Sequence, residues 1–162
     1  SHDSWTTRQF LQLASSLADQ QLDQDCGIGH RTVRQTLEHI IWNVECWTDL
    51  MAGDVVRHRP SGCQSIRDLI ARFDMASAQF TGLARKVTDE GRLNERFRDT
   101  LDDPPQWNSI GTAIVHLATH GMHHRAHLLI MFRQLGIADL PEGDALSWDD
   151  AVSAMETDET KS

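Results

Sequence analysis

Four long stretches of this chain repeat apolar residues every three to five positions, which is the period of an amphipathic helix. They run from Trp5 to Leu22, from Val33 to Gly53, from Ile66 to about Gly91 and from Ile110 to Leu135. No strand-rich block and no internal repeat interrupts them. The pattern predicts an all-α four-helix bundle with up-down helices and a long connection before the last core helix.

Residues that favour helix starts and helix ends mark the second and third helices. Thr32 or a nearby polar residue can open the second helix, and Gly53 follows its last apolar residues. Ser65 and Asp68 have the spacing of a capping box at the start of the third helix. We therefore expect the second helix to end at Gly53 and the third to begin directly after Ser65.

A long polar connection separates the third helix from the fourth. Residues 92–106 contain two consecutive prolines and cannot continue a helix, although Arg96–Arg98 can form a short extended segment. Asn108 or Ser109 can cap the last helix, and Gly136 can end it in a left-handed conformation.

The length and charge of the chain limit its organisation and its partners. At 162 residues it has the size of one ordinary domain. We assign residues 1–140 to the bundle and residues 141–162 to an acidic, loosely packed tail, in which a turn can form around Trp148. The net charge of −9 counts against binding to nucleic acid or to an anionic membrane, because phosphate contacts need clustered Lys and Arg. No apolar stretch reaches the about 20 residues that span a bilayer.

The cysteines and the first residues indicate the compartment. Cys26, Cys46 and Cys63 are odd in number and lack a Cys-x-x-Cys motif, so neither a disulfide framework nor a thiolate zinc site is expected. Free thiols agree with a reducing environment. The chain does not start with basic residues followed by an apolar run, so we expect no secretory signal and predict a cytoplasmic protein.

Five histidines stand within twelve residues of the last predicted helix: His116, His120, His123, His124 and His127. Neutral imidazole is the commonest protein ligand for transition metals, and side chains four residues apart on a helix lie on the same face. On a helical wheel His124 falls nearly on the apolar stripe, with His120 about 40° to one side. Two buried imidazoles on an apolar stripe are costly unless something is bound between them.

A third nitrogen ligand would have to come from another helix. His39 is the one other histidine inside a predicted helix, and it lies on a flank of the second helix that Trp42, Cys46 and Leu50 make apolar. Three histidines leave one or more positions of a zinc-like ion open to water or to a substrate thiol or carbonyl. The alternative interpretation is that these are surface or edge histidines with ordinary hydrogen bonds. For His116, His123 and His127, contact with the ligands or plain exposure is the simpler interpretation.

The segment from His116 to His127, continued by Phe132-Arg-Gln-Leu-Gly136, resembles the last core helix of the DinB/YfiT-like family. That family has a histidine, three residues, His-Arg and then Leu-Arg-x-Leu-Gly in this helix. The segment Thr36–Ile40 resembles the family's first metal histidine, and the similarity extends over about residues 5–140. Two departures are His127, where the family often has Gln, and Phe132, which replaces an aliphatic residue.

The resemblance implies a bundle that binds one divalent metal, zinc or nickel, through His39, His120 and His124. The family includes predicted metal-dependent hydrolases, bacterial transferases that use bacillithiol or mycothiol, and members without known activity. Homodimers are common in it. We therefore expect a metal-dependent enzyme with a small-molecule substrate, which a low-molecular-weight thiol can be, and no nucleic-acid or membrane partner. A noncatalytic metal-binding protein of the stress response, acting through binding or dimer contacts, is the alternative.

The sequence lacks the motifs of di-iron bundles, zinc proteases and serine hydrolases. The last helix carries no acidic residue between Ile110 and Leu135, which argues against a di-iron bundle, and neither His-Glu-x-x-His nor Gly-x-Ser-x-Gly occurs. Cys46 lies near His39 but is expected to be a packing residue. Arg125 points away from the ligands and is expected to form a structural ion pair. Glu38 and Glu45 are candidate bases, although exposed helical carboxylates are the simpler interpretation.

Overall fold

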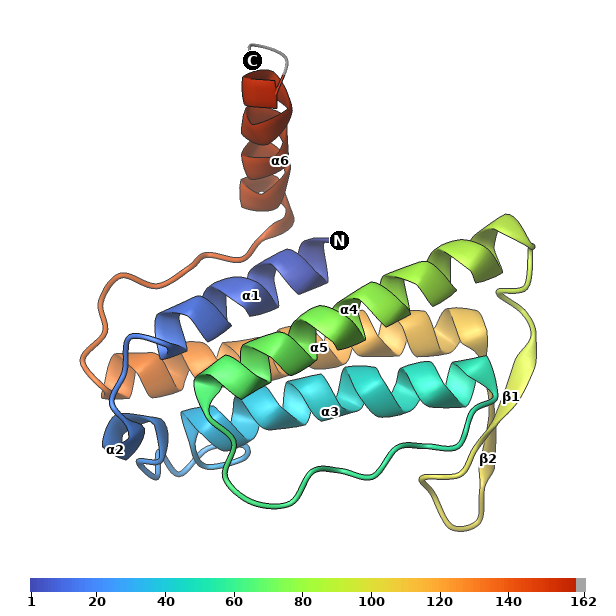
Figure 1. Cartoon of the computed structure of the whole chain (residues 1–162), viewed down its shortest axis with the longest axis horizontal. Coiled ribbons are helices and arrows are strands. Elements are labelled where there is room, and N and C mark those ends of the chain that lie inside the picture. The colour runs from blue at the N-terminus through green and yellow to red at the C-terminus, as the bar shows by residue number, and fades with distance from the viewer. Residues whose placement is uncertain (160–162) are drawn as a thin grey trace.

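The predicted all-α bundle is confirmed by the computed structural model, which describes residues 1–159 and the side chains of residues 1–154. Four long helices lie side by side in Figure 1: α1 (His2–Ala14), α3 (Val33–Ala52), α4 (Ile66–Asp89) and α5 (Ile110–Gln134). None of the described helices is both long and apolar enough to cross a membrane.

The helix boundaries follow the capping residues of the sequence. The Thr32 hydroxyl accepts a hydrogen bond from the Gln35 backbone N–H at 3.1 Å, and Gly53 ends α3 with a φ of 77°, in the left-handed region. The Ser65 hydroxyl likewise accepts from the backbone N–H of Asp68 at 3.1 Å. Ser109, rather than Asn108, caps α5 by accepting from the Thr112 N–H at 3.2 Å. The predicted boundaries of α3, α4 and α5 are therefore confirmed.

The first predicted helix, Trp5 to Leu22, is wrong as a single element. The helix α1 ends at Ala14, and a separate short helix α2 covers Asp19–Leu22. The hydroxyls of Ser15 and Ser16 donate hydrogen bonds to the carbonyls of the preceding turn, at 2.6 and 2.7 Å. Serine competes in this way for helical backbone groups and favours helix ends. The prediction followed the apolar spacing and did not take this signal into account.

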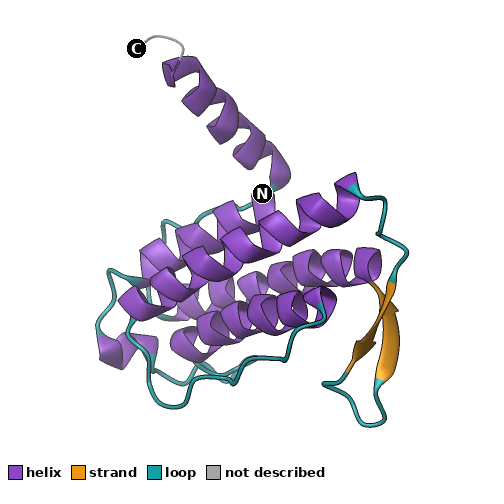
Figure 2. Cartoon of the chain, turned by 45° about the vertical axis from the view of Figure 1, so that its right-hand side comes forward, coloured by secondary structure: helices purple, strands orange, loops and turns teal. Residues whose placement is uncertain are grey.

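The connection before α5 contains a hairpin of which the sequence indicated one half. Strand β1 (Arg96–Asp99) covers the predicted extended segment, and it pairs antiparallel with β2 (Gln106–Ser109). Figure 2 shows this hairpin at one end of the bundle. Phe97 of β1 is buried and meets the Trp47 ring edge-on, with 6.1 Å between the ring centroids. β2 runs without a break into α5.

Residues Ala145–Glu159 form a further helix, α6, where the sequence indicated no more than a turn around Trp148. It projects away from the bundle in Figure 1. The segment before it is fixed to α1, because Nε2 of His2 lies 2.9 Å from the Gly143 carbonyl oxygen. The Trp148 ring also meets the His2 ring edge-on at 6.0 Å. The proposed division at residue 140 stays a prediction.

The core consists of two apolar clusters, and the histidine segment of α5 lies between them. One cluster joins α1, α3 and α4 to the C-terminal part of α5 through Leu128, Met131 and Phe132. The other surrounds the N-terminal part of α5, with Ile110, Ala113 and Leu117. Residues 118–127 of α5 contribute to neither cluster. The bundle is thus held on both sides of the histidines by ordinary apolar packing.

Arg125 forms the structural ion pair that its direction on α5 predicts. Its buried guanidinium donates from Nη1 to Asp3 Oδ1 at 2.5 Å and to the Thr7 hydroxyl at 3.0 Å. Both partners belong to α1. The ion pair comes so close to α5 that a Cβ on Gly121 would lie 2.7 Å from Asp3 Oδ1. The first turns of α1 are therefore anchored directly behind the histidine segment.

We expect Phe73→Ala to lower the free energy of unfolding by about 3–5 kcal/mol, since the Phe73 ring is 1% exposed in the core. Met75→Ala on the same helix is the matched control, because Met75 is 61% exposed and its loss should change stability by less than about 0.5 kcal/mol. Urea unfolding followed by circular dichroism measures both. Equal effects would contradict this assignment of the buried face of α4.

Candidate metal centre

The three histidines predicted from separate helices come together in the structure. Nε2 of His39, on α3, lies 3.1 Å from Nε2 of His120, on α5. Nε2 of His124, one turn further along α5, is also 3.1 Å from Nε2 of His120. The predicted convergence of these side chains is confirmed. The convergence by itself does not assign them as metal ligands.

A fourth histidine, His30, joins the group from the loop between α2 and α3. His30, His39 and His124 each offer a ring nitrogen within 4.8 Å of the others, and the three could hold a metal ion. The His30 ring lies over that of His39, with 3.8 Å between centroids and 32° between planes. His30 lies outside the predicted helices, so helical spacing alone does not mark it as a candidate ligand.

The loop that carries His30 has an unusual backbone. Gly27, Gly29 and Arg31 all have positive φ, of 66°, 50° and 70°. Glycine adopts such angles freely, whereas a side chain such as that of Arg31 does so at a cost. An ion pair from Arg31 to Asp25, and a 2.7 Å hydrogen bond from the Cys26 N–H to the Arg31 carbonyl, hold the turn. The spacing of the two glycines was the available sequence signal for this tight turn.

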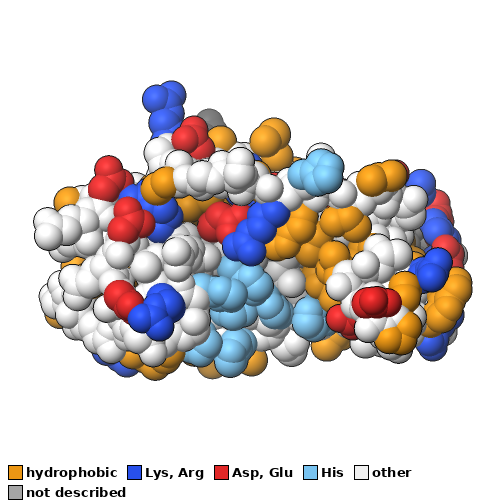
Figure 3. All heavy atoms as spheres, turned by 90° about the horizontal axis from the view of Figure 1, so that it is seen from below, with side chains coloured by type: hydrophobic (Ala, Val, Ile, Leu, Met, Phe, Trp, Pro, Cys, Tyr) orange, Lys and Arg blue, Asp and Glu red, His pale blue; other side chains and the backbone are white. Residues whose placement is uncertain are grey.

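Ring contacts link seven of the nine histidines of the chain into one histidine patch: His30, His39, His116, His120, His123, His124 and His127. At one end His116 lies between the rings of Trp47 and His120. At the other end the rings of His123 and His127 meet edge-on, with 4.4 Å between their centroids. Figure 3 shows the patch reaching the surface beside a pair of opposite charges. A bound ion would thus be reachable from solvent.

Burial keeps the central imidazoles uncharged. It lowers the pKa of His39 and of His124 to about 3 and that of His120 to about 4, and the neighbouring histidines add to the effect. Burial also lowers the pKa of His30. A neutral imidazole has a free lone pair on one ring nitrogen, whereas a protonated one has none. At neutral pH the group therefore offers lone pairs rather than repelling a cation.

The donor set fits a divalent transition metal. Nitrogen ligands about 2.1 Å from a tetrahedral or octahedral ion lie about 3.0–3.4 Å from one another, and the Nε2 separations from His120 to His39 and to His124 fall in that range. The group that includes His39 and His124 and has all three nitrogens within 4.8 Å of one another has His30, not His120, as its third member. Nδ1 of His124 is buried and has no hydrogen-bond partner among residues 1–154. Imidazole donors favour zinc, nickel or copper over magnesium or calcium, which prefer oxygen ligands.

Both a family model and a solved structure are similar to this chain. The family model described as DinB superfamily matches residues 2–128. This chain belongs to the DinB superfamily. Its fold is also similar to the crystal structure of a DinB-like protein from Bacillus cereus ATCC 10987, with a TM-score of 0.65 and 18% sequence identity. That similarity covers 86% of this chain and 89% of the Bacillus chain. No curated protein matches this sequence.

The carboxylates near the histidines of this DinB chain are not the exposed acids that the sequence analysis expected. Glu38 accepts hydrogen bonds from the Arg59 guanidinium, with 3.0 Å between Nε and Oε2. Glu45 is buried and bonded in the same way to Arg72, with 3.0 Å between Nε and Oε1. Each carboxylate is therefore held by an arginine. Glu38 directly precedes His39, which brings the Arg59 charge close to the patch.

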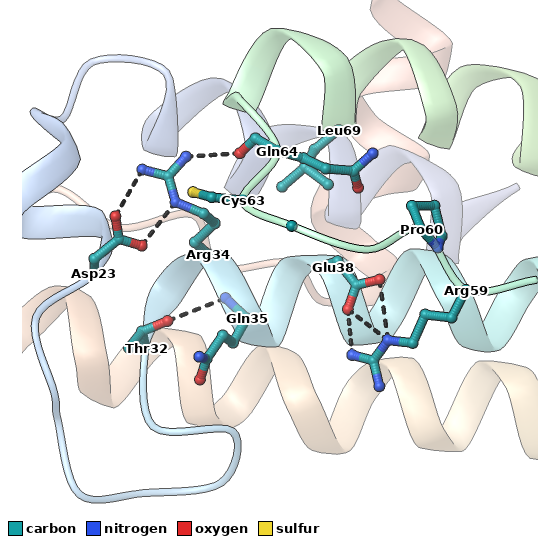
Figure 4. A pocket seen from close by; sticks show the side chains of 11 residues that line it. Asp23, Thr32, Arg34, Gln35, Glu38, Arg59, Pro60, Cys63, Gln64 and Leu69 are labelled. Carbon is teal, nitrogen blue, oxygen red and sulfur yellow. Dashed lines mark hydrogen bonds and ion pairs between the residues drawn. The ribbon is translucent and has the colours of Figure 1, made fainter.

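A cavity of about 550 Å³ opens beside this ion pair, between α3 and the segment that leads to α4. Figure 4 shows Glu38 and Arg59 at one end of it, and Arg34, bonded to Asp23 and Gln64, at the other. None of the described histidines lines it. The Glu38–Arg59 pair therefore lines a small-molecule-sized space, and Glu38 is the direct neighbour of His39 in the sequence.

Cys46 is a packing residue, as the sequence analysis expected. It is buried, and its thiol donates to the Asn43 carbonyl at 3.5 Å. Burial raises the pKa of the Cys46 thiol to about 12, which leaves almost no thiolate at neutral pH.

We expect a thiol reagent at pH 8 to label Cys63, which is exposed, and to leave Cys46 unmodified until the protein is unfolded. The reason is that the thiolate is the reactive form and that Cys46 stays protonated below its raised pKa. Mass spectrometry after native and denatured labelling measures this, and Cys63→Ser identifies the fast site. Rapid native labelling of Cys46 would contradict the buried, protonated state.

Proposed function

We propose that this DinB protein is a metal-dependent enzyme. It would bind one divalent transition metal, zinc or nickel, through His39, His120 and His124. The observation that carries the proposal is the pair of 3.1 Å separations that join Nε2 of His120 to Nε2 of His39 and of His124. These nitrogens come from two helices whose register is fixed by packing. A site on rigid helices keeps its geometry when a ligand leaves or enters.

An ion with three protein ligands keeps positions open, at which it lowers the pKa of a bound water to about 7 or activates a thiol. Two further conditions are neutral ligands and access for the substrate, and the residues of the chain meet both. The half-buried His39 and His120 and the buried His124 stay neutral, and the surface position of the histidine patch gives a small molecule access. Water or a low-molecular-weight thiol would be the nucleophile, so the reaction would be a hydrolysis or an S-transfer.

The cavity beside Glu38 and Arg59 is the candidate position for the substrate, which we propose to be a small molecule. Its two arginines are paired with carboxylates, so the space has no strong net charge. Nucleic acid is not proposed as a substrate, since a chain with a net charge of −9 repels phosphates. A homodimer and a cytoplasmic location, expected from the resemblance and the free thiols, remain part of the proposal.

His30 favours the second candidate function, that of a noncatalytic metal-binding protein. Its ring nitrogen lies within 4.8 Å of those of His39 and His124, so a fourth imidazole is available to the same ion. Four protein ligands close a zinc site, whereas three leave it open. The number of histidines that bind the ion therefore separates the two functions.

We expect the untagged wild-type protein to bind zinc or nickel tightly and to lose that site in His39→Ala and in His120→Ala. Loss of a direct ligand should weaken binding by more than the about 10–100-fold that loss of a supporting hydrogen bond costs. Stripping the ion should also lower the melting temperature, since a ligand at 100 times its Kd adds about 2.7 kcal/mol of stability. Elemental analysis after purification without a nickel column, followed by calorimetric titration, gives both measurements.

His58→Ala is the matched control, because His58 is exposed and lies outside the histidine patch. It should bind like the wild type. Unchanged tight binding in both His39→Ala and His120→Ala would disprove the ligand assignment. In His30→Ala an open, catalytic site keeps its affinity and any activity, whereas a closed four-histidine site loses affinity by at least about tenfold.

The two enzymatic reactions can be separated with monochlorobimane. An S-transferase forms a carbon–sulfur bond from the thiol to the bimane, expels chloride and releases the thiol proton to solvent. We expect fluorescence to increase only when protein, metal and a low-molecular-weight thiol are all present, and to stay at the uncatalysed rate in His120→Ala. A hydrolase would instead cleave an activated ester without any thiol. Absence of both activities in metal-loaded protein favours the noncatalytic function.

A further inference from the structure

We propose a second metal position at the outer end of the histidine patch, formed by His123, His127 and His124. Each of these side chains offers one ring nitrogen, and the three nitrogens lie within 4.8 Å of one another. The inference rests on the proposed function in one respect, since His124 belongs to both positions. We call the site of His39, His120 and His124 the inner position and the new one the outer position.

The two ring nitrogens of His124 have different surroundings. Nε2 lies 3.1 Å from Nε2 of His120 and so faces the inner position. Nδ1 is buried, and no hydrogen bond satisfies it among the described residues. An unpartnered buried nitrogen is costly, and an ion is one way to satisfy it. We therefore assign Nδ1 of His124 to the outer position.

His127 repeats this pattern on the same helix. Its Nδ1 is also buried and has no hydrogen-bond partner in the described part of the chain. The loop before α3 lies directly on it, because a Cβ on Gly29 would come within 2.5 Å of Nδ1 of His127. His123 is exposed and stands one turn before His127, with 4.4 Å between the ring centroids. A pair of histidines four residues apart on a helix presents both rings to the same ion.

The chemistry of the outer position selects its ligand. All three donors are imidazoles, and no carboxylate belongs to the described group, so a late first-row divalent ion is favoured over magnesium or calcium. Because His123 is exposed, the outer ion should be more weakly held and more readily exchanged than the inner one. If both positions were filled, His124 would offer one ring nitrogen to each ion and would release its ring proton to the solvent.

The test is a calorimetric titration of untagged, metal-stripped full-length protein with nickel chloride, with magnesium chloride as the negative probe. We expect the wild type to bind two nickel ions per chain with different affinities, and to bind no magnesium. His123→Gln and His127→Gln should each weaken the second ion by at least about tenfold and leave the first unchanged. His58→Gln is the matched control and should still bind two ions. His123 is exposed, so its replacement leaves the fold intact.

A single nickel ion per wild-type chain would overturn the outer position. So would a second ion that persists in both glutamine variants. The inner position has its own readout, because His39→Ala should remove the tighter ion and keep a weaker one that depends on His123. If the wild type binds one ion that His39→Ala abolishes and His123→Gln leaves unchanged, the proposed function stands and the outer position fails. If His39→Ala leaves both ions in place, the proposed function fails instead.

Discussion

The packing of α3 against α5 is the constraint on which the rest of the structure depends. Leu37 and Ile40 of α3 and Leu128 and Met131 of α5 are fully or almost fully buried in one cluster, which fixes how the two helices face each other. Interiors packed at crystal-like density do not slide, so a shift of α3 along α5 would open cavities. With that register fixed, His39 faces the turn of α5 that carries His120 and His124.

Placing imidazoles at this junction costs stability. Burial disfavours their charged forms, and two ring nitrogens, Nδ1 of His124 and Nδ1 of His127, have no hydrogen-bond partner in the described structure. A chain selected for stability alone would fill these positions with leucine or methionine. The two apolar clusters on either side supply the stability that this stretch of α5 lacks. A local departure from good packing between well-packed regions is typical of a functional site.

Much of this arrangement could be predicted from the sequence, because it follows from local rules. Helix caps act over three or four residues, which is why Thr32, Ser65 and Ser109 mark the starts of their helices correctly. The convergence of His39 with His120 and His124 follows from helical period and the order of the helices, together with the family resemblance. The metal itself remains a prediction.

What the sequence could not supply depends on contacts between distant segments. His30 reaches the patch because a loop with three positive φ angles folds over α3, and no periodic pattern encodes that fold. β2 is a strand because β1 pairs with it, although its own residues carry little strand propensity. The arginine partners of Glu38 and Glu45 are 21 and 27 residues away in sequence. Long-range pairing of this kind is invisible to a reading based on spacing.

The ion pair between Asp3 and Arg125 makes the start of the chain part of the support for α5. Gly121 lacks a side chain where the ion pair approaches the helix, so α1 lies almost flush with the turn that joins His120 to His124. A change at Asp3 or in the first turn of α1 would therefore act on the histidine helix from its far side. Metal binding can thus depend on residues that lie outside the histidine patch, even with every histidine intact.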